Sequence, residues 1–304
     1  MSLTFARPLA VIVLTLTLAA CAPSAPAPTS ISSPASGASA GRPSPSPLAL
    51  PSDPNTLLLA VRTAGGPQTA DAAFSQINGL RLYADGRLLS SSGLQSRYPG
   101  PLLDPLSLNQ LSTEQVRTLL GEAAGAGLTS GRDQQYLAKN QPTMPSTVIA
   151  VWSAAGLTTT SFAGLGVGGL AANPAETQAR NRAQIFLSTI TSLISAKGSA
   201  PSSLYAPSEV RLLVRPNRAA AAPGPSGSAS LAWPLDTPLS DFGTLYPAGG
   251  PGTRCGAVSG TDLTLLWPLL EKANQLTAWT SGDQSYQLVA RELLPDEQGG
   301  CLAN

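Results

Sequence analysis

Few side chains of this chain are equipped for chemistry, and one common catalytic type is missing altogether. The 304 residues include no histidine and three cysteines, Cys21, Cys255 and Cys301. Without histidine, the sequence excludes Ser-His-Asp and Cys-His catalysis, histidine metal sites and the usual acid–base group of neutral pH. A carboxylate-based hydrolase stays open, because a glycosidase needs only two acids. The Asp and Glu residues are scattered, however, so we assign no catalytic, cofactor-binding or metal-ligating residue.

Two short motifs match known nucleotide-site patterns but lack their context. Residues 164–169 (GLGVGG) match G-x-G-x-x-G, yet the next helix is expected only near Pro174 and no acidic residue follows about 20 positions on. Residues 241–243 (DFG) resemble a kinase metal-binding triplet, without the glycine loop, lysine strand or catalytic loop of a kinase. We interpret the first motif as a loop and the second as a turn.

The adjacent acids and the aromatic side chains allow two interpretations each. Asp296 and Glu297 would point apart on a strand, so a shared acid–base role is not expected and a solvated loop is. Aromatic side chains could line a ligand groove or fill the core, and Trp279, in the polar segment 276–282, is the strongest groove candidate. The other aromatic candidates are Trp152, Trp233, Trp267, Tyr83, Tyr205 and Tyr286.

The first 20 residues have the pattern of an export signal. Arg7 is the only charge before an apolar stretch that runs from Leu9 to Ala20. This stretch has 12 residues, whereas a membrane-spanning helix needs about 20. Residues 1–20 are therefore expected to be a signal peptide and not a transmembrane anchor.

The end of this stretch, Leu18-Ala19-Ala20-Cys21, resembles the lipobox of bacterial lipoproteins. The resemblance covers residues 1–21 and implies cleavage before Cys21 and a diacylglycerol thioether on that cysteine. Two or three acyl chains would then hold the protein to a bacterial membrane, on the periplasmic or extracellular face. The alternative is an ordinary secretory signal with a cysteine near its end.

The stretch after Cys21 has the composition of a spacer. Residues 22–54 contain nine prolines among Ala, Ser and Thr, and only two charges, Arg42 and Asp53. Such a segment cannot bury enough apolar surface to offset its ordering entropy. We expect residues 21–54 to be a lipidated, disordered linker that spans about 30 Å as a coil; a packed arm is the alternative.

Residues 55–304 are expected to form the exported folded region, with a subdivision near residues 200–230. Once Arg7 leaves with the signal, 17 of the 18 basic side chains remain against 17 acidic ones. The net charge is then zero, and a nucleic-acid partner, which requires a basic patch, is not expected.

Cysteine arithmetic predicts one disulfide. With Cys21 lipidated, Cys255 and Cys301 are left as a pair in an exported chain, where disulfides are the usual outcome. The bond would brace the C-terminal end. A redox pair favours closer C-x-x-C spacing, and a metal site needs more than two ligands.

Hydrophobic periodicity and turn residues predict an α+β fold, in which antiparallel hairpins pack with two or three helices. Hairpin turns are expected at Asp85-Gly86 and at residues 154–156. A capping box of Ser112 and Gln115 opens a helix that ends near Ala126. The other expected helices cover 174–197 and 261–274, and the expected strands cover 56–62, 80–83, 87–89, 147–152, 157–162, 209–215 and 286–293.

Three finer expectations concern the C-terminal half. Cys255 is expected in a Gly/Pro-rich loop, and Pro268 is expected to kink its helix or delay its start. The stretches 113–129 and 261–277 share their spacing, which suggests a duplicated β-β-α-β module; two generic amphipathic helices are the alternative.

Segments of this half, 232–235 (AWPL), 254–256 (RCG), 273–277 (ANQLT) and 294–297 (LPDE), resemble uncharacterised bacterial lipoproteins without an assigned activity. The resemblance implies location and architecture and carries no site residue. Our leading hypothesis is a non-enzymatic envelope domain that binds a partner protein, a glycan or a small ligand. The alternatives are a carboxylate-based hydrolase acting on envelope glycans and a protein inhibitor that uses the loop near 247–254.

Overall fold

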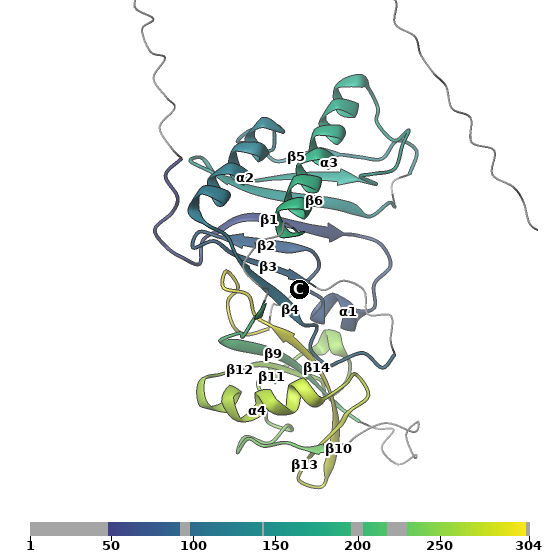
Figure 1. Cartoon of the computed structure of the whole chain (residues 1–304). Helices are drawn as coiled ribbons and strands as arrows, with labels where there is room; N and C mark the ends of the chain where they lie inside the picture. Colours follow the sequence, from purple (N-terminus) through teal and green to yellow (C-terminus); the bar gives the residue numbers. More distant parts are fainter. Residues whose placement is uncertain (1–47, 92–97, 142, 196–202, 218–229, 302–304) are drawn as a thin grey trace, which may run out of the picture. The chain divides into compact units, whose positions relative to one another are not determined.

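The computed structural model describes residues 48–91, 98–141, 143–195, 203–217 and 230–301. The chain divides into two units, Met1–Ser46 and Pro47–Asn304, and every described residue belongs to the second. The expected signal peptide, Cys21 and most of the expected linker therefore lie outside the described residues. The described part contains two sheets of mostly antiparallel strands and four α-helices, which confirms the α+β class (Figure 1).

The first sheet has eight strands in the spatial order β5-β7-β6-β1-β2-β3-β4-β8. Neighbouring strands run antiparallel, except for the parallel pair β5 and β7. The first strand in sequence, β1, lies inside the sheet with β2 on one side and β6 on the other. The strands are β1 (Leu57–Ala64), β2 (Leu80–Tyr83), β3 (Arg87–Ser91), β4 (Leu106–Gln110), β5 (Gln134–Tyr136), β6 (Ser146–Ser153), β7 (Gly156–Ala163) and β8 (Ser203–Leu204).

Both predicted hairpins of this sheet are confirmed. β2 and β3 pair across Asp85-Gly86, and β6 and β7 pair across residues 154–155. Gly86 has a φ of +86°, and a Cβ there would lie 2.3 Å from the carbonyl oxygen of Leu111. Only glycine fits this turn, which sets the register of the two strands.

Helix α2 (Thr113–Gly125) begins where its capping box predicts. The Gln115 amide donates to Ser112 Oγ at 3.2 Å, and the Ser112 amide donates to Gln115 Oε1 at 2.8 Å. These bonds satisfy two amides that a helix start otherwise leaves unpaired. The buried residues of α2 are the predicted apolar stripe, Val116, Leu119, Leu120 and Ala123.

Helix α3 (Pro174–Ser195) lies on the same face of the first sheet as α2 (Figure 1). Ala183, Phe186 and Ile190 of α3 join the α2 stripe and the sheet in one hydrophobic core. The predicted last turn, to Lys197, lies outside the described residues. A short helix, α1 (Ala70–Ser75), was not predicted; it begins at Thr69, whose hydroxyl accepts from the Ala72 amide at 3.2 Å.

The second sheet has six strands in the order β10-β13-β14-β9-β12-β11. Cys255 lies in β12, opposite Leu213 of β9, so the expected loop position is wrong: the Gly/Pro-rich loop ends at Thr253 and the strand begins at Arg254. The strands are β9 (Glu209–Pro216), β10 (Ser230–Ala232), β11 (Thr244–Leu245), β12 (Arg254–Ser259), β13 (Ala278–Ser281) and β14 (Gln284–Glu292), with a 3₁₀ turn at Pro247–Gly249.

Helix α4 (Gly260–Lys272) packs on one face of the second sheet (Figure 1). Its buried leucines, at positions 263, 266 and 270, share a core with Trp279 and with the inward residues of β9 and β14. The helix contains Pro268 and already begins at Gly260, so the proline does not delay its start.

The two sheets do not repeat one module. After α2, the β6–β7 hairpin joins β1 through its first strand, β6, whereas after α4 the β13–β14 hairpin joins β9 through its second strand, β14. Both helices have 13 residues. The shared spacing therefore reflects two amphipathic helices of equal length, not a duplicated β-β-α-β unit.

Part of the expected linker packs on the fold. Leu50 contacts the first core, and Arg117 Nε donates to the Leu48 carbonyl at 3.3 Å. Leu48 and Leu50 therefore contact the folded region, while most of the other side chains of residues 48–54 are exposed. Among the described helices, none is both long enough and apolar enough to cross a membrane.

Candidate functional site

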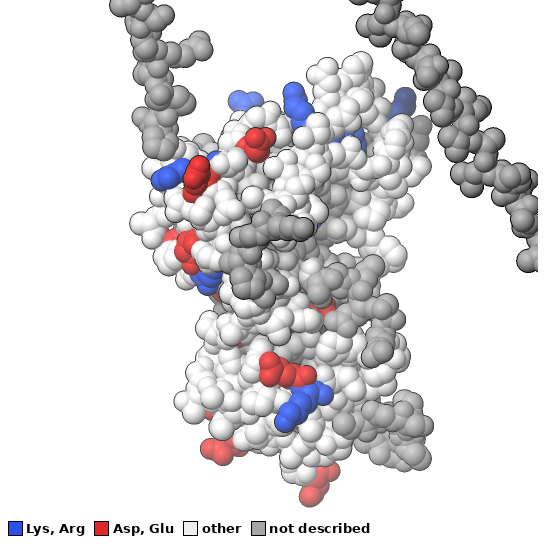
Figure 2. Space-filling model, in the orientation of Figure 1, with Lys and Arg blue, Asp and Glu red and all other residues white. Residues whose placement is uncertain are grey.

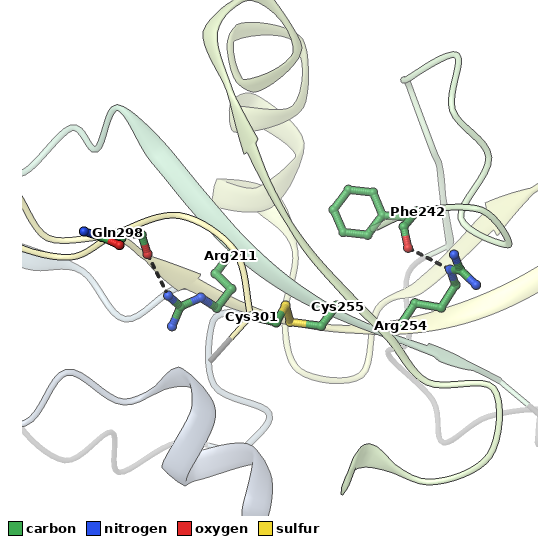
Figure 3. Close-up of a disulfide and its surroundings, with 6 residues drawn as sticks. All are labelled: Arg211, Phe242, Arg254, Cys255, Gln298 and Cys301. Carbon is green, nitrogen blue, oxygen red and sulfur yellow. Dashed lines mark hydrogen bonds between the residues drawn. A yellow bond between two sulfur atoms is a disulfide. The ribbon is translucent and has the colours of Figure 1, made fainter. Parts of the chain in front are cut away.

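The second sheet continues into a C-terminal segment, residues 293–301, which carries many of the polar contacts described below. The segment leaves β14 at Leu293, whose amide donates to the Glu209 carbonyl at 3.0 Å. At its far end Cys301 forms a disulfide with Cys255, with the two Cα atoms 5.9 Å apart (Figure 3). This is the pair that the cysteine count predicts, and it leaves neither cysteine as a free thiol.

Two arginines lie on either side of the disulfide (Figure 3). Arg211 Nη2 donates to the Gln298 carbonyl at 3.0 Å, and Arg254 Nε donates to the Phe242 carbonyl at 2.7 Å. The first bond fixes the C-terminal segment to β9, and the second fixes β12 to the loop before it. Both arginines therefore act as internal donors to the backbone.

The adjacent acids of this segment lie beyond β14, where Asp296 is exposed, as expected, and Glu297 is half-buried. Asp296 Oδ1 accepts from the Tyr83 hydroxyl at 2.6 Å, across to the first sheet. Glu297 forms an ion pair with Arg291 and accepts from the Leu294 amide. The two carboxylates serve separate partners: those of Glu297 are close in sequence, whereas the partner of Asp296, Tyr83, is distant and could not be identified from local pattern.

Two tyrosines connect the C-terminal segment to the first sheet. Tyr205 donates its hydroxyl hydrogen to the Leu293 carbonyl at 3.0 Å, and both Tyr205 and Tyr83 pack with Leu294 in one hydrophobic cluster. Burial raises the pKa of Tyr205 to about 12. Burial and the hydrogen bond to Asp296 raise the pKa of Tyr83 still further. Both phenols are neutral hydrogen-bond donors throughout the physiological range.

Three arginines share the face of the second sheet that α4 does not cover. Arg211 lies directly opposite Arg291 in the β9–β14 register, and burial together with the Arg291 charge lowers the pKa of Arg211. Arg291 pairs with Glu297, and Arg215 pairs with Asp71 of α1 at 2.5 Å. These ion pairs offset two of the three cationic charges, and Arg211 donates to the Gln298 carbonyl.

Glu292 is the most perturbed carboxyl of the described chain. It is 5% exposed, and its Oε2 has no hydrogen-bond partner among the described residues. Burial, followed by the charges of Asp104 and Glu271, raises the pKa of Glu292 to about 8. The group is therefore mostly protonated at neutral pH. Sequence reasoning missed it, since Glu292 lies at the end of a strand and nothing local marks it.

A shallow hollow of about 570 Å³ lies at one end of the first sheet. Ser161 in the hollow faces away from the core, because the next residue, Phe162, points into it. The hydroxyl and amide side chains of the lining make no hydrogen bond within the described residues, and none of the lining side chains is ionisable. The lining residues are Ala64, Gly65, Gly66, Pro67, Gln135, Thr143, Met144, Ser146 and Ser161.

The aromatic side chains fill the cores and do not form a groove. Trp279 is fully buried in β13 and packs edge-on against Trp233, with ring centroids 6.1 Å apart. Trp233 in turn packs against Phe242 at 5.9 Å. Tyr286 belongs to the same core, and Trp152 and Trp267 are half-buried against the first and second core respectively.

The two nucleotide-like motifs form the loop and the turn that we expected. Residues 164–169 precede α3, and Leu170 of this connection accepts from the Lys139 amide at 3.0 Å. Below it, Arg180 forms a buried ion pair with Glu176 and donates to the Ala163 carbonyl at 2.8 Å. In the DFG triplet, Asp241 donates its amide to the Pro238 carbonyl in a turn.

The loop considered for an inhibitor is exposed at residues 247, 248, 251 and 252. It is held by its own hydrogen bonds, from the Tyr246 amide to the Thr253 carbonyl at 2.9 Å and from Thr253 Oγ1 to the Gly249 carbonyl at 2.8 Å. Its one charged side chain, Arg254, donates to the Phe242 and Gly243 carbonyls and is therefore turned into its own chain.

Surface charge does not single out a further site. On the face drawn in Figure 2, blue and red side chains are scattered or lie in small mixed groups, without a continuous field of one sign. Within the part of the chain that the structure covers, no three Asp, Glu, Cys or His side chains are placed to hold a metal ion.

No protein-family model, curated protein or solved structure shows a significant match to this chain.

Proposed function

We propose that the chain is an exported bacterial lipoprotein, held to a membrane by lipid on Cys21, whose folded part binds an envelope ligand without transforming it. The hollow on the first sheet carries the binding half of the proposal. It joins unpaired hydroxyl and amide groups with the small apolar surface of Met144 and Pro67, and it contains no ionisable group that could transfer a proton.

The chemistry of the hollow favours an uncharged, hydroxyl-rich ligand, such as a neutral glycan. Ser161, Ser146 and Thr143 can each donate and accept a hydrogen bond, and the Gln135 amide can do both. The glycines at 65 and 66 have φ angles of +76° and +86° and leave their backbone open to a ligand. An envelope protein or another small ligand would use fewer of these hydrogen-bonding groups.

A titration with neutral oligosaccharides, followed by NMR shifts or thermal stability, tests the binding half. The double variant Gln135→Ala, Ser161→Val should lose at least tenfold in affinity, and Gln178→Ala, an exposed glutamine on α3, should not. Binding that is equal in all three proteins would place the ligand elsewhere. No response to any glycan would reject this ligand class.

Membrane fractionation tests the anchor. The wild-type chain should sediment with membranes, and Cys21→Ser should move it to the soluble exported fraction, because acyl burial is worth roughly 0.8 kcal/mol per CH₂. A Cys21→Ser chain that still sediments would contradict lipid anchoring.

A carboxylate-based hydrolase acting on envelope glycans is the second candidate. It is favoured by Glu292, which is protonated at neutral pH as a general acid must be, with the ionisable groups Asp104 and Glu271 near it. The burial of Glu292 argues against substrate access. Turnover of a glycan by the wild type that is abolished in Glu292→Gln would establish this candidate over the first.

A further inference from the structure

The connection between β3 and β4 crosses from the first sheet to the second. Leu102 and Leu103 of this connection are buried in the core beneath α4. The Leu102 amide donates to the Ala273 carbonyl at 3.0 Å, and the Gln275 amide donates to the Gly100 carbonyl at 3.0 Å. We call residues 100–104 the docking segment, because these bonds attach it to the end of α4.

The docking segment brings a carboxylate next to a buried one. Asp104, at its end, and Glu271, in the last turn of α4, are the two charged groups that act on Glu292. Glu292 lies at the end of β14, on the side of Leu288 and Ala290, which belong to the core that α4 and the docking segment share. Two elements, the docking segment and α4, therefore bring a carboxyl group within electrostatic range of Glu292.

Among the described residues, the other neighbours of Glu292 offer no compensating cation. Its partner on β9 is Val210, and Arg291, the next residue of β14, points to the opposite face, where it pairs with Glu297. Tyr205 is close enough for the Glu292 charge to help raise its pKa. Within the described residues, each group that shifts the pKa of Glu292 raises it.

We propose that Glu292 is a pH-sensitive latch, which holds the docking segment while it is protonated and releases it when it ionises. A neutral carboxyl can be buried here at moderate cost, whereas a carboxylate would be desolvated, without a hydrogen bond at Oε2 and repelled from both sides. Displacing the docking segment would admit water to Glu292 and separate it from Asp104. The proposal is independent of the anchor and of the hollow.

Amide hydrogen exchange on the full-length chain tests the latch, with rates corrected for the intrinsic effect of pH. Protection of the Leu102 and Gln275 amides should fall at least tenfold between pH 7 and pH 9. The amides of α2 should keep their protection over the same range, which distinguishes local release from general unfolding. Protection of the docking segment that does not change with pH would overturn the proposal.

Two variants and a control locate the titrating group. In Glu292→Gln the protection should stay high up to pH 9, and in the exposed control Glu122→Gln it should fall as in the wild type. In Glu271→Gln the midpoint of the transition should move to lower pH, because the Glu271 charge raises the pKa of Glu292 and its removal lowers that pKa. A Glu292→Gln protein that follows the wild-type curve would overturn the proposal. If that variant does not fold, an unchanged midpoint in Glu271→Gln would overturn it independently.

Discussion

The two sheets are stabilised in different ways. The first is covered by two helices, α2 and α3, whose apolar stripes follow a regular helical period and pack on the sheet in one core. The second has one helix, and its opposite face is held by the C-terminal segment, the disulfide and the ion pair of Arg215 with Asp71 on α1. The comparison shows that two helices with regular apolar stripes cover the first sheet, whereas the face of the second sheet opposite α4 is held by contacts between residues far apart in sequence.

Truncating the largest buried side chain of each core should have the largest effect and tests whether both sheets depend on packing. Phe186→Ala in the first core and Trp279→Ala in the second should each reduce the free energy of unfolding by about 3–5 kcal/mol. Denaturant unfolding measures both values. A loss below about 1 kcal/mol in either variant would show that its core is not the main source of stability.

Removing the disulfide should affect the second sheet more than the first. Cys255→Ala with Cys301→Ala should lower the free energy of unfolding by about 2–4 kcal/mol, because the unfolded chain regains the freedom of a long loop. Exchange should increase at amides of β12 and of residues 293–301 more than at amides of α2. Equal changes in both sheets would indicate that the C-terminal segment is not specific to the second.

The pH dependence of stability sharpens the comparison, because Glu292 belongs to the second sheet. Its pKa is raised from 4.5 to about 8 on folding, so between these values the unfolded state has lost a proton that the folded state retains. Stability should therefore be full below about pH 4.5, fall as the pH rises and level off above about pH 8, by at most about 5 kcal/mol in total. In Glu292→Gln this decrease should be absent from a series of denaturation curves between pH 5 and pH 9.

The smallest expected effect concerns the first sheet. Ser112→Ala removes the acceptor of the capping box of α2 and should cost about 1 kcal/mol of stability. Ser112→Asp, which keeps an acceptor at the helix start, should restore most of it. Thermal unfolding of the three proteins measures the difference, and equal midpoints would mean that packing alone sets the start of α2.

The difference between the sheets also explains what could be predicted from the sequence. The capping box at Ser112, the turn at Gly86 and the stripe of α2 are local, so they identified their elements with the right boundaries. Cys255 was placed in a loop because glycine and proline precede it, although its pairing with β9 makes it a strand residue. The sequence does not predict the short strands β4, β5, β8, β10, β11 and β13, since short strands are formed by their neighbours in the sheet and not by their own pattern.

The same limit applies to the candidate sites. The disulfide could be predicted by counting cysteines, because only two remain once Cys21 is set aside and their pairing requires no knowledge of the fold. Glu292, the hollow and the bond between Tyr83 and Asp296 could not, since each joins elements that only the folded chain brings together. The absence of histidine excludes histidine-dependent catalysis and histidine metal sites, but it does not indicate where a ligand would bind.

The position of β1 has a mechanical consequence. A tether attached on the N-terminal side reaches the fold at the arm of residues 48–54 and then at β1, which is hydrogen-bonded to β2 on one side and β6 on the other. A pull along this strand would load both ladders in shear, so that many hydrogen bonds must yield together. An edge strand pulled in the same direction would load only one ladder. A domain held in this way can bear tension through the middle of its first sheet.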